Sequence, residues 1–273
     1  MAHPWEDSIR LGIVHFMACP EVMGGSGPVA ATADALLADG FFTVLEAGPV
    51  TDPAARAALK TTVAARGATL ACGAQPLQLA QKLNLNATDS VERGKAVFAV
   101  RAELARAKEM DPAGFVVLSG PDPADPIRPL AMDALVDSLA TICREAAPLP
   151  VHLEVFDFDV DKKCLIGPTA RAVELARRVR ATSANFGLLL DLSHLPIQHE
   201  PSADALPLAA DVLTHAHVGN CVIKDRTHPR YGDQHPRFGI AGGENGEAEL
   251  AEFLSLLFKV GYLKRGTPRI VTI

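Results

Sequence analysis

Three side chains of the kind that binds divalent cations stand where short apolar segments end. Glu154 ends the run VHLE, Asp191 follows GLLL, and His217 lies in LTHAHVGN. Two carboxylates and an imidazole suit Mn²⁺, Mg²⁺, Zn²⁺ or Co²⁺ better than a dedicated calcium cage. Singly, such an Asp is often a helix cap and such a His is often a hydrogen-bonded core residue. Their recurrence at consecutive segment ends favours a shared metal site.

Histidines two residues upstream accompany two of these positions. His215 shares a strand face with His217, and His152 shares one with Glu154, because side chains alternate along a strand with period two. Of each pair, the residue nearer the end of the segment is the better candidate for a ligand. We therefore expect His215 and His152 to lie deeper, in the core or behind the ligands.

A second group of polar residues follows these segments. His194 comes three residues after Asp191, and GDQHPRFG places Asp233 and His235 one residue apart. These side chains could hold a second ion or bind a polyhydroxylated substrate. The alternative is that GDQHP is a turn, capped by its Asp and stiffened by its Pro.

Further substrate-binding candidates lie near the early apolar segments and in a long polar loop. His15, Glu46 and Gln75 stand on or just beyond early segments, and Lys224 lies in the irregular stretch 220–247. Lys224, with the neighbouring arginines, could meet a phosphate or carboxylate, although a solvated loop charge is the commoner fate. For Glu46 a structural salt bridge is the alternative.

The elements that must position these residues alternate along the chain. Eight strand-like apolar runs occur at 10–17, 41–47, 69–74, 114–119, 151–156, 186–191, 212–218 and 269–273. Helical periodicity covers 28–38, 53–66, 90–108, 129–146, 168–180 and 247–260, and more weakly 203–210. Such alternation indicates βαβ units around a parallel sheet. It predicts a single (β/α)₈ TIM barrel spanning 1–273, with an open doubly wound sheet as the alternative.

Composition narrows the classes of function. The chain has 273 residues, 26 basic and 32 acidic, and no basic patch that would suit a nucleic acid. No run approaches the roughly 18 apolar residues of a membrane span, and the first residues do not read as a signal peptide. We expect a cytoplasmic protein, able to form a homo-oligomer. Five widely spaced cysteines without a CxxC pair are expected to be core thiols, namely Cys19, Cys72, Cys143, Cys164 and Cys221.

The motifs HLEVFD, LDLSH and HAHVGN resemble those of the xylose isomerase-like barrel superfamily, which includes sugar phosphate isomerases and epimerases, inosose dehydratase and endonuclease IV-type enzymes. The resemblance implies metal ligands in the order Glu, Asp, His and Glu, of which Glu154, Asp191 and His217 match the first three. It also implies that His194 contacts substrate, as in the ketose epimerase branch. The fourth ligand is expected directly after IVTI, where this sequence ends, so the domain is expected to lack a C-terminal tail carrying it.

The repair-enzyme branch resembles the chain at Asp233 and His235, since its third metal uses an Asp-x-His pair in the same loop. That branch also needs histidines near residues 75 and 120, where this chain has CGAQP and LSGPDP. A complete three-zinc phosphodiesterase site is therefore not expected.

The function expected from these features is a metal-dependent sugar or sugar-phosphate isomerase or epimerase. Its substrate would be a small carbohydrate or polyol, and Glu154 would move a proton through an enediolate. The alternatives are a dehydratase or lyase acting on a keto-polyol such as an inosose, an endonuclease IV-like phosphodiesterase, and a non-catalytic sugar-binding barrel.

Overall fold

A computed structural model describes residues 4–273, in which eight parallel strands pair in sequence order and close into a barrel. Closure comes from β1 and β8, where Ile9 pairs with Arg269 and Gly12 with Thr272. The strands are β1 Ile9–Val14, β2 Val44–Ala47, β3 Thr69–Gly73, β4 Phe115–Val117, β5 Val151–Glu154, β6 Phe186–Asp191, β7 Leu213–His217 and β8 Arg269–Thr272. The predicted (β/α)₈ barrel is thus confirmed, and the open-sheet alternative is wrong.

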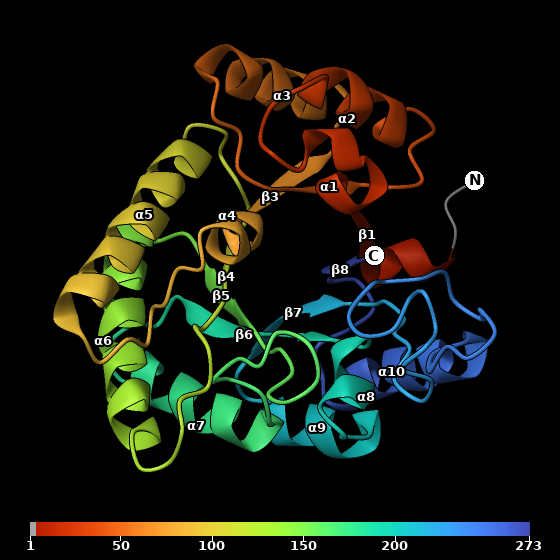
Figure 1. Cartoon of the computed structure of the whole chain (residues 1–273). Helices are drawn as coiled ribbons and strands as arrows, with labels where there is room; N and C mark the ends of the chain where they lie inside the picture. The colour runs from red at the N-terminus through yellow and green to blue at the C-terminus, as the bar shows by residue number, and fades with distance from the viewer. Residues whose placement is uncertain (1–3) are drawn as a thin grey trace.

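Ten α-helices occur among residues 4–273, and the longer ones form a ring around the strands (Figure 1). They are α1 His15–Ala18, α2 Val29–Leu37, α3 Pro53–Ala65, α4 Gln75–Ala80, α5 Ser90–Lys108, α6 Arg128–Ala146, α7 Thr169–Arg180, α8 His194–Ile197, α9 Ser202–Ala209 and α10 Glu247–Lys259. Short 3₁₀ turns occupy Pro4–Asp7 and Pro20–Val22. Three short helices were not expected from the sequence: α1, α4 and α8 begin immediately after a strand or within a few residues of its end, and α1 takes the last residues of the first predicted strand.

Local sequence explains where two long helices begin. Asp52 accepts hydrogen bonds from the backbone N–H groups of Ala54 and Ala55, and a proline fills the first position of α3. Asp89 accepts from the N–H of Glu92 at the start of α5. Both arrangements satisfy donors that have no partner inside the helix.

The core lies between the strands and the helices, and apolar residues of both fill it. Every residue of β5 and β6 is buried, as expected for parallel strands covered on both faces. Four of the five cysteines are buried, Cys19 is partly buried, and all are free thiols. No helix of residues 4–273 is long and apolar enough to cross a membrane.

The inside of the barrel is more polar than its outer layer. Side chains of β2 and β7 meet across it, and the rings of His152 and His215 stack with centroids 5.1 Å apart. Gly114 leaves room for this pair, because a Cβ atom there would lie 2.6 Å from Nε2 of His152. His152 and His215 are therefore buried below the mouth of the barrel, as the sequence predicts.

Candidate metal centre

The three expected ligands converge at the C-terminal mouth of the barrel. Glu154, Asp191 and His217 are the last residues of β5, β6 and β7, and the register pairs Asp191 directly with His217. Nδ1 of His217 lies 3.7 Å from Oε1 of Glu154 and 3.9 Å from Oδ2 of Asp191. All three side chains are buried. Parallel strands bring these residues together because their carboxyl ends share one face of the barrel.

The spacing and chemistry of these donors fit a divalent ion. Two atoms bound to one such ion at 2.0–2.2 Å lie roughly 3 to 4 Å apart, which is close to the separations around Nδ1 of His217. These two separations are too long for hydrogen bonds. The imidazole nitrogen and the two carboxylates therefore face one another without direct contact. The ligand atoms of the three residues all lie within 4.8 Å of one another.

Neighbouring charges control the protonation of the His217 side chain. Burial alone lowers the pKa of His217, but the carboxylates of Glu46 and Glu154 outweigh it and raise this pKa well above its usual value. Burial raises the pKa of Asp191, but the nearby imidazoles outweigh burial and lower this pKa below its usual value. The Asp191 carboxyl is thus kept ionised and attracts a cation.

Gln75 holds one oxygen of the Glu154 carboxylate. Its Nε2 donates to Oε2 of Glu154 at 3.0 Å, which leaves the other carboxylate oxygen turned towards His217. Gln75 is the first residue of α4, two positions after the end of β3. Gly73 makes room for it, since a Cβ atom there would lie 1.8 Å from Oε1 of Gln75.

A second cluster lies beside the first. Oδ1 of Asp233 is 3.2 Å from Nε2 of His194 and 2.8 Å from Nε2 of His235. Among residues 4–273, neither Oδ1 of Asp233 nor Nε2 of His194 makes a hydrogen bond of acceptable geometry, although both atoms are buried. Ligand atoms of Asp191, His194 and His235 lie within 4.8 Å of one another, so this cluster also has the composition of a cation site.

The charge state of this second cluster follows from its carboxylates. Burial lowers the pKa of His194, but Asp233 and Asp191 outweigh it and raise this pKa to about 10. The pKa of Asp233 is held well below its usual value by His194 and His235, against the opposing effect of burial. Without an added cation, the cluster is therefore held together by an imidazolium facing a carboxylate.

A pocket of about 720 Å³ opens over these groups. Its polar lining comprises Gln75, Glu154, Lys162, His217, Asp233 and His235. The rest of its wall is mainly apolar, from Val14, Phe16, Met17, Met23, Pro76, Leu79, Ala80 and Phe156. A smaller cavity of about 300 Å³ touches Asp191 and His217 from the side of β8.

Three of the proposed substrate-binding residues lie away from this pocket lining. His15 is buried behind β1 with Nε2 2.8 Å from Oγ1 of Thr32. The Lys224 side chain is 79% exposed and pairs with Glu244. Glu46 is buried beneath His217 and contacts that residue and His215. None of the three is among the residues that line this pocket, and their contact with substrate stays a prediction.

Lys162 is a pocket residue that the sequence analysis missed. Its Nζ lies 2.9 Å from Oδ2 of Asp161 and 3.4 Å from Oδ2 of Asp233. The loop after β5 holds it there, because the Asp157 carboxylate accepts hydrogen bonds from consecutive backbone N–H groups of residues 160–163. The charged run DVDKK after a strand end was the available signal, but the fold of that loop was not readable from it.

Comparison with known proteins shows the family to which this barrel belongs. The fold is a closed eight-stranded parallel barrel with carboxylates and histidines gathered at its mouth. The family model for the xylose isomerase-like TIM barrel matches residues 33–267, and the chain belongs to that family. The resemblance in the motifs of β5 to β7 is thereby confirmed. No curated protein matches the sequence.

Solved structures share the fold at low sequence identity. A D-psicose 3-epimerase from Clostridium cellulolyticum H10 is 19% identical with a TM-score of 0.71, over 97% of this chain and 84% of that one. An L-ribulose 3-epimerase is 18% identical with a TM-score of 0.70, over 97% and 80%. An AP endonuclease, family 2, from Brucella melitensis is 17% identical with a TM-score of 0.67, over 97% and 92%. These likenesses show the fold.

Proposed function

We propose that this chain is a metal-dependent isomerase or epimerase of small sugars, with Glu154 as its acid/base. The observation that supports it most is the convergence of Glu154, Asp191 and His217 at separations that suit metal ligands. Glu154 and His217 also line a pocket large enough for a monosaccharide. The names of the structural neighbours, several of them sugar 3-epimerases, point the same way.

Glu154, Asp191 and His217 would hold the ion. When bound, the ion supplies Lewis-acid polarisation of a substrate carbonyl and stabilises negative charge on its oxygen. Glu154 removes the proton from the hydroxyl-bearing carbon next to that carbonyl. The C–H electron pair forms a double bond between the two carbons while the carbonyl π pair moves onto its oxygen, which gives an enediolate. Gln75 keeps the carboxylate oriented by holding Oε2.

The fate of the proton separates the two reactions. If the same carboxylate delivers the proton to the neighbouring carbon, an aldose and a ketose are interconverted. Return to the original carbon from the opposite face inverts that carbon and needs a second acid/base. Loss of a β-hydroxyl from the same enediolate would instead give the dehydratase that the sequence leaves as an alternative.

The pocket lining favours an uncharged sugar over a sugar phosphate. Among the described residues that line the larger pocket, Lys162 is the only lysine or arginine, and it is already paired with Asp161 and Asp233. Lys224, which the sequence suggested for a phosphate, is exposed and paired with Glu244. The apolar wall suits the carbon skeleton of a sugar and not an additional dianion.

Deuterium exchange tests this function. Metal-loaded protein is incubated in D₂O with free ketohexoses and ketopentoses, including D-psicose, D-tagatose and L-ribulose, and NMR follows deuterium at the carbon next to the carbonyl. We expect exchange with the native protein and a loss of at least about 100-fold in Glu154→Gln, the lower range for an acid/base group. Glu103→Gln is the matched control, because Glu103 is equally buried but pairs with Arg106 on α5. Unchanged exchange in Glu154→Gln would contradict the assignment.

The second cluster supports one other function, a metal-dependent phosphodiesterase. Buried atoms of His194 and Asp233 that lack hydrogen bonds beside His235 are what an additional ion would use. Such an enzyme would bind two or more ions per chain and cleave DNA at abasic sites. Elemental analysis showing one ion, with no cleavage of an abasic duplex, excludes this function.

A further inference from the structure

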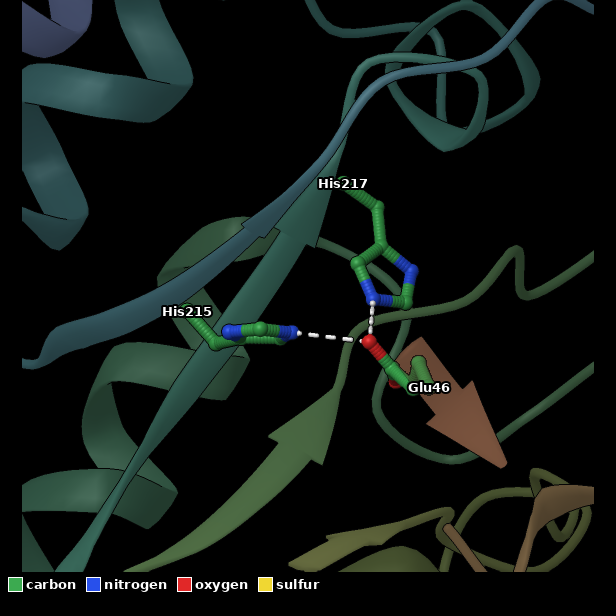
Figure 2. A group of neighbouring side chains, drawn as sticks. All are labelled: Glu46, His215 and His217. Atoms are coloured by element: carbon green, nitrogen blue, oxygen red, sulfur yellow. Dashed lines mark hydrogen bonds and ion pairs between the residues drawn. The ribbon is translucent and has the colours of Figure 1, made fainter. Parts of the chain in front are cut away.

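Glu46 connects two histidines across the inside of the barrel. Its Oε2 lies 3.1 Å from Nε2 of His215 and 3.0 Å from Nε2 of His217, and Figure 2 shows both rings turned towards this one oxygen. Glu46 belongs to β2 and the histidines to β7, which are not neighbours in the barrel. The Glu46 side chain is 2% exposed, so it reaches its partners through the protein interior.

In a neutral His217, the contacts with Glu46 determine which ring nitrogen carries the proton. An ionised carboxylate only accepts hydrogen bonds, so each ring must donate to it through Nε2–H. For a neutral His217 this places the lone pair on Nδ1. Nδ1 is the atom that faces Oε1 of Glu154 at 3.7 Å and Oδ2 of Asp191 at 3.9 Å. Glu46 thus selects the tautomer and ring orientation in which Nδ1 can bind a cation.

The energetic cost of this arrangement argues for a role beyond packing. A buried carboxylate loses its hydration, and apolar residues of similar volume often give equal or greater stability. In addition, Oε1 of Glu46 is buried and has no hydrogen-bond partner among residues 4–273. The arrangement is costly for the fold and useful for His217.

We propose that Glu46 is a positioning residue for the metal centre, acting through His217. It keeps Nε2 of His217 protonated and the ring aimed, while His215 donates the second hydrogen bond that fixes the carboxylate. This inference rests on the proposed function, because it requires an ion at Glu154, Asp191 and His217. This role differs from the substrate contact that the sequence suggested for Glu46.

The same three residues offer another arrangement. The ligand atoms of Glu46, His215 and His217 lie within 4.8 Å of one another and could themselves surround a cation inside the barrel. An ion there would occupy Nε2 of both histidines and displace their protons. Positioning by Glu46 instead requires a proton on Nε2 of His217 and the ion on Nδ1. The two arrangements therefore differ in whether Nε2 of His217 carries a proton or binds the ion.

Metal affinity is the first test. Zn²⁺ and Co²⁺ are titrated calorimetrically into metal-free native protein, Glu46→Gln and the control Glu103→Gln. We expect Glu46→Gln to weaken binding 10- to 100-fold, the usual effect of removing the carboxylate behind a ligating histidine, while Glu103→Gln binds like the native protein. Equal affinity in Glu46→Gln and native protein overturns the positioning role. Failure of the native protein to bind either ion overturns the proposed function instead.

A second measurement uses the native protein alone, so it does not depend on whether a variant folds. ¹⁵N–¹H correlation spectra of the histidine side chains in the Zn²⁺-loaded native protein report which ring nitrogen is protonated. We expect a slowly exchanging proton on Nε2 of His217 and a metal-shifted Nδ1. Nδ1–H, or zinc on Nε2, refutes the proposal.

Discussion

Gln75 and Glu154 lie 79 positions apart in the sequence and share a 3.0 Å hydrogen bond from Nε2 to Oε2. Both side chains are buried, and the bond fixes one carboxylate oxygen while the other faces His217. The sequence suggested that Gln75 binds substrate, a role that would not need this contact with Glu154, the expected metal ligand. Gln75 also lines the pocket, so it can serve both purposes.

Loss of the Gln75 side chain is expected to reduce sugar turnover. A hydrogen bond to a charged group contributes roughly 1.5–3 kcal/mol, so Gln75→Ala should lower kcat/KM about 10- to 100-fold. Gln81→Ala, at the exposed C-terminal end of α4, is the control for changes in the same helix. Steady-state kinetics on the best substrate measure both variants. Unaltered kcat/KM in Gln75→Ala would show that Glu154 needs no such support.

A substitution at Gly73 would disturb the same hydrogen bond between Gln75 and Glu154. A methyl group at this position would lie 1.8 Å from Oε1 of Gln75 and would push its amide away from Glu154. Gly73→Ala should therefore lower kcat/KM much as Gln75→Ala does. The double variant should lose little more than either single one, because both remove one interaction. Additive losses would mean that Gly73 acts on something else.

Removal of the ion should lower thermal stability. A cation that binds only the folded state stabilises it by about 2.7 kcal/mol at 100 times its Kd. We expect Tm of chelator-treated protein to rise when Mn²⁺, Co²⁺ or Zn²⁺ is added. Asp191→Asn, which removes a ligand, should lose most of this rise, whereas Asp211→Asn, a change of an exposed carboxylate, should keep it. An equal rise in both variants would place the ion elsewhere.

Stability should also fall in mild acid because of His15. Burial lowers the pKa of His15 to about 4, against a smaller opposing effect of Glu21. Between pH 6.5 and 4 the unfolded chain binds a proton here that the folded chain does not, so stability is lost as the pH falls through this range. The loss from this group is about 2 kcal/mol between pH 7.5 and 5.

Urea unfolding at these two pH values tests that expectation. The native protein should lose about 2 kcal/mol more than His15→Gln on acidification, by the same linkage. His199→Asn is the control, because the His199 side chain is half exposed. Identical pH dependence in the native protein and His15→Gln would show that His15 is not the group responsible.

Much of the centre could be predicted because it depends on strand order. The ends of parallel strands meet at one face of a barrel, so Glu154, Asp191 and His217 had to converge once the strands were recognised. Lys162 and Lys224 depended on loop conformation, which periodicity does not encode. The position of Glu46 depended on a contact through the barrel interior between β2 and β7, which no local pattern indicates.

The contacts of Glu46 and Gln75 divide the centre between two parts of the chain. The proposed ligands come from β5 to β7, whereas the residues that contact Glu154 and His217 from behind come from β2 and from the helix after β3. A half-barrel fragment containing only the later strands would keep every ligand and lose both supports. The two halves of this barrel are thus chemically interdependent, and recombination with half-barrels from relatives should preserve the centre only when Glu46 and Gln75 are transferred together with their partners.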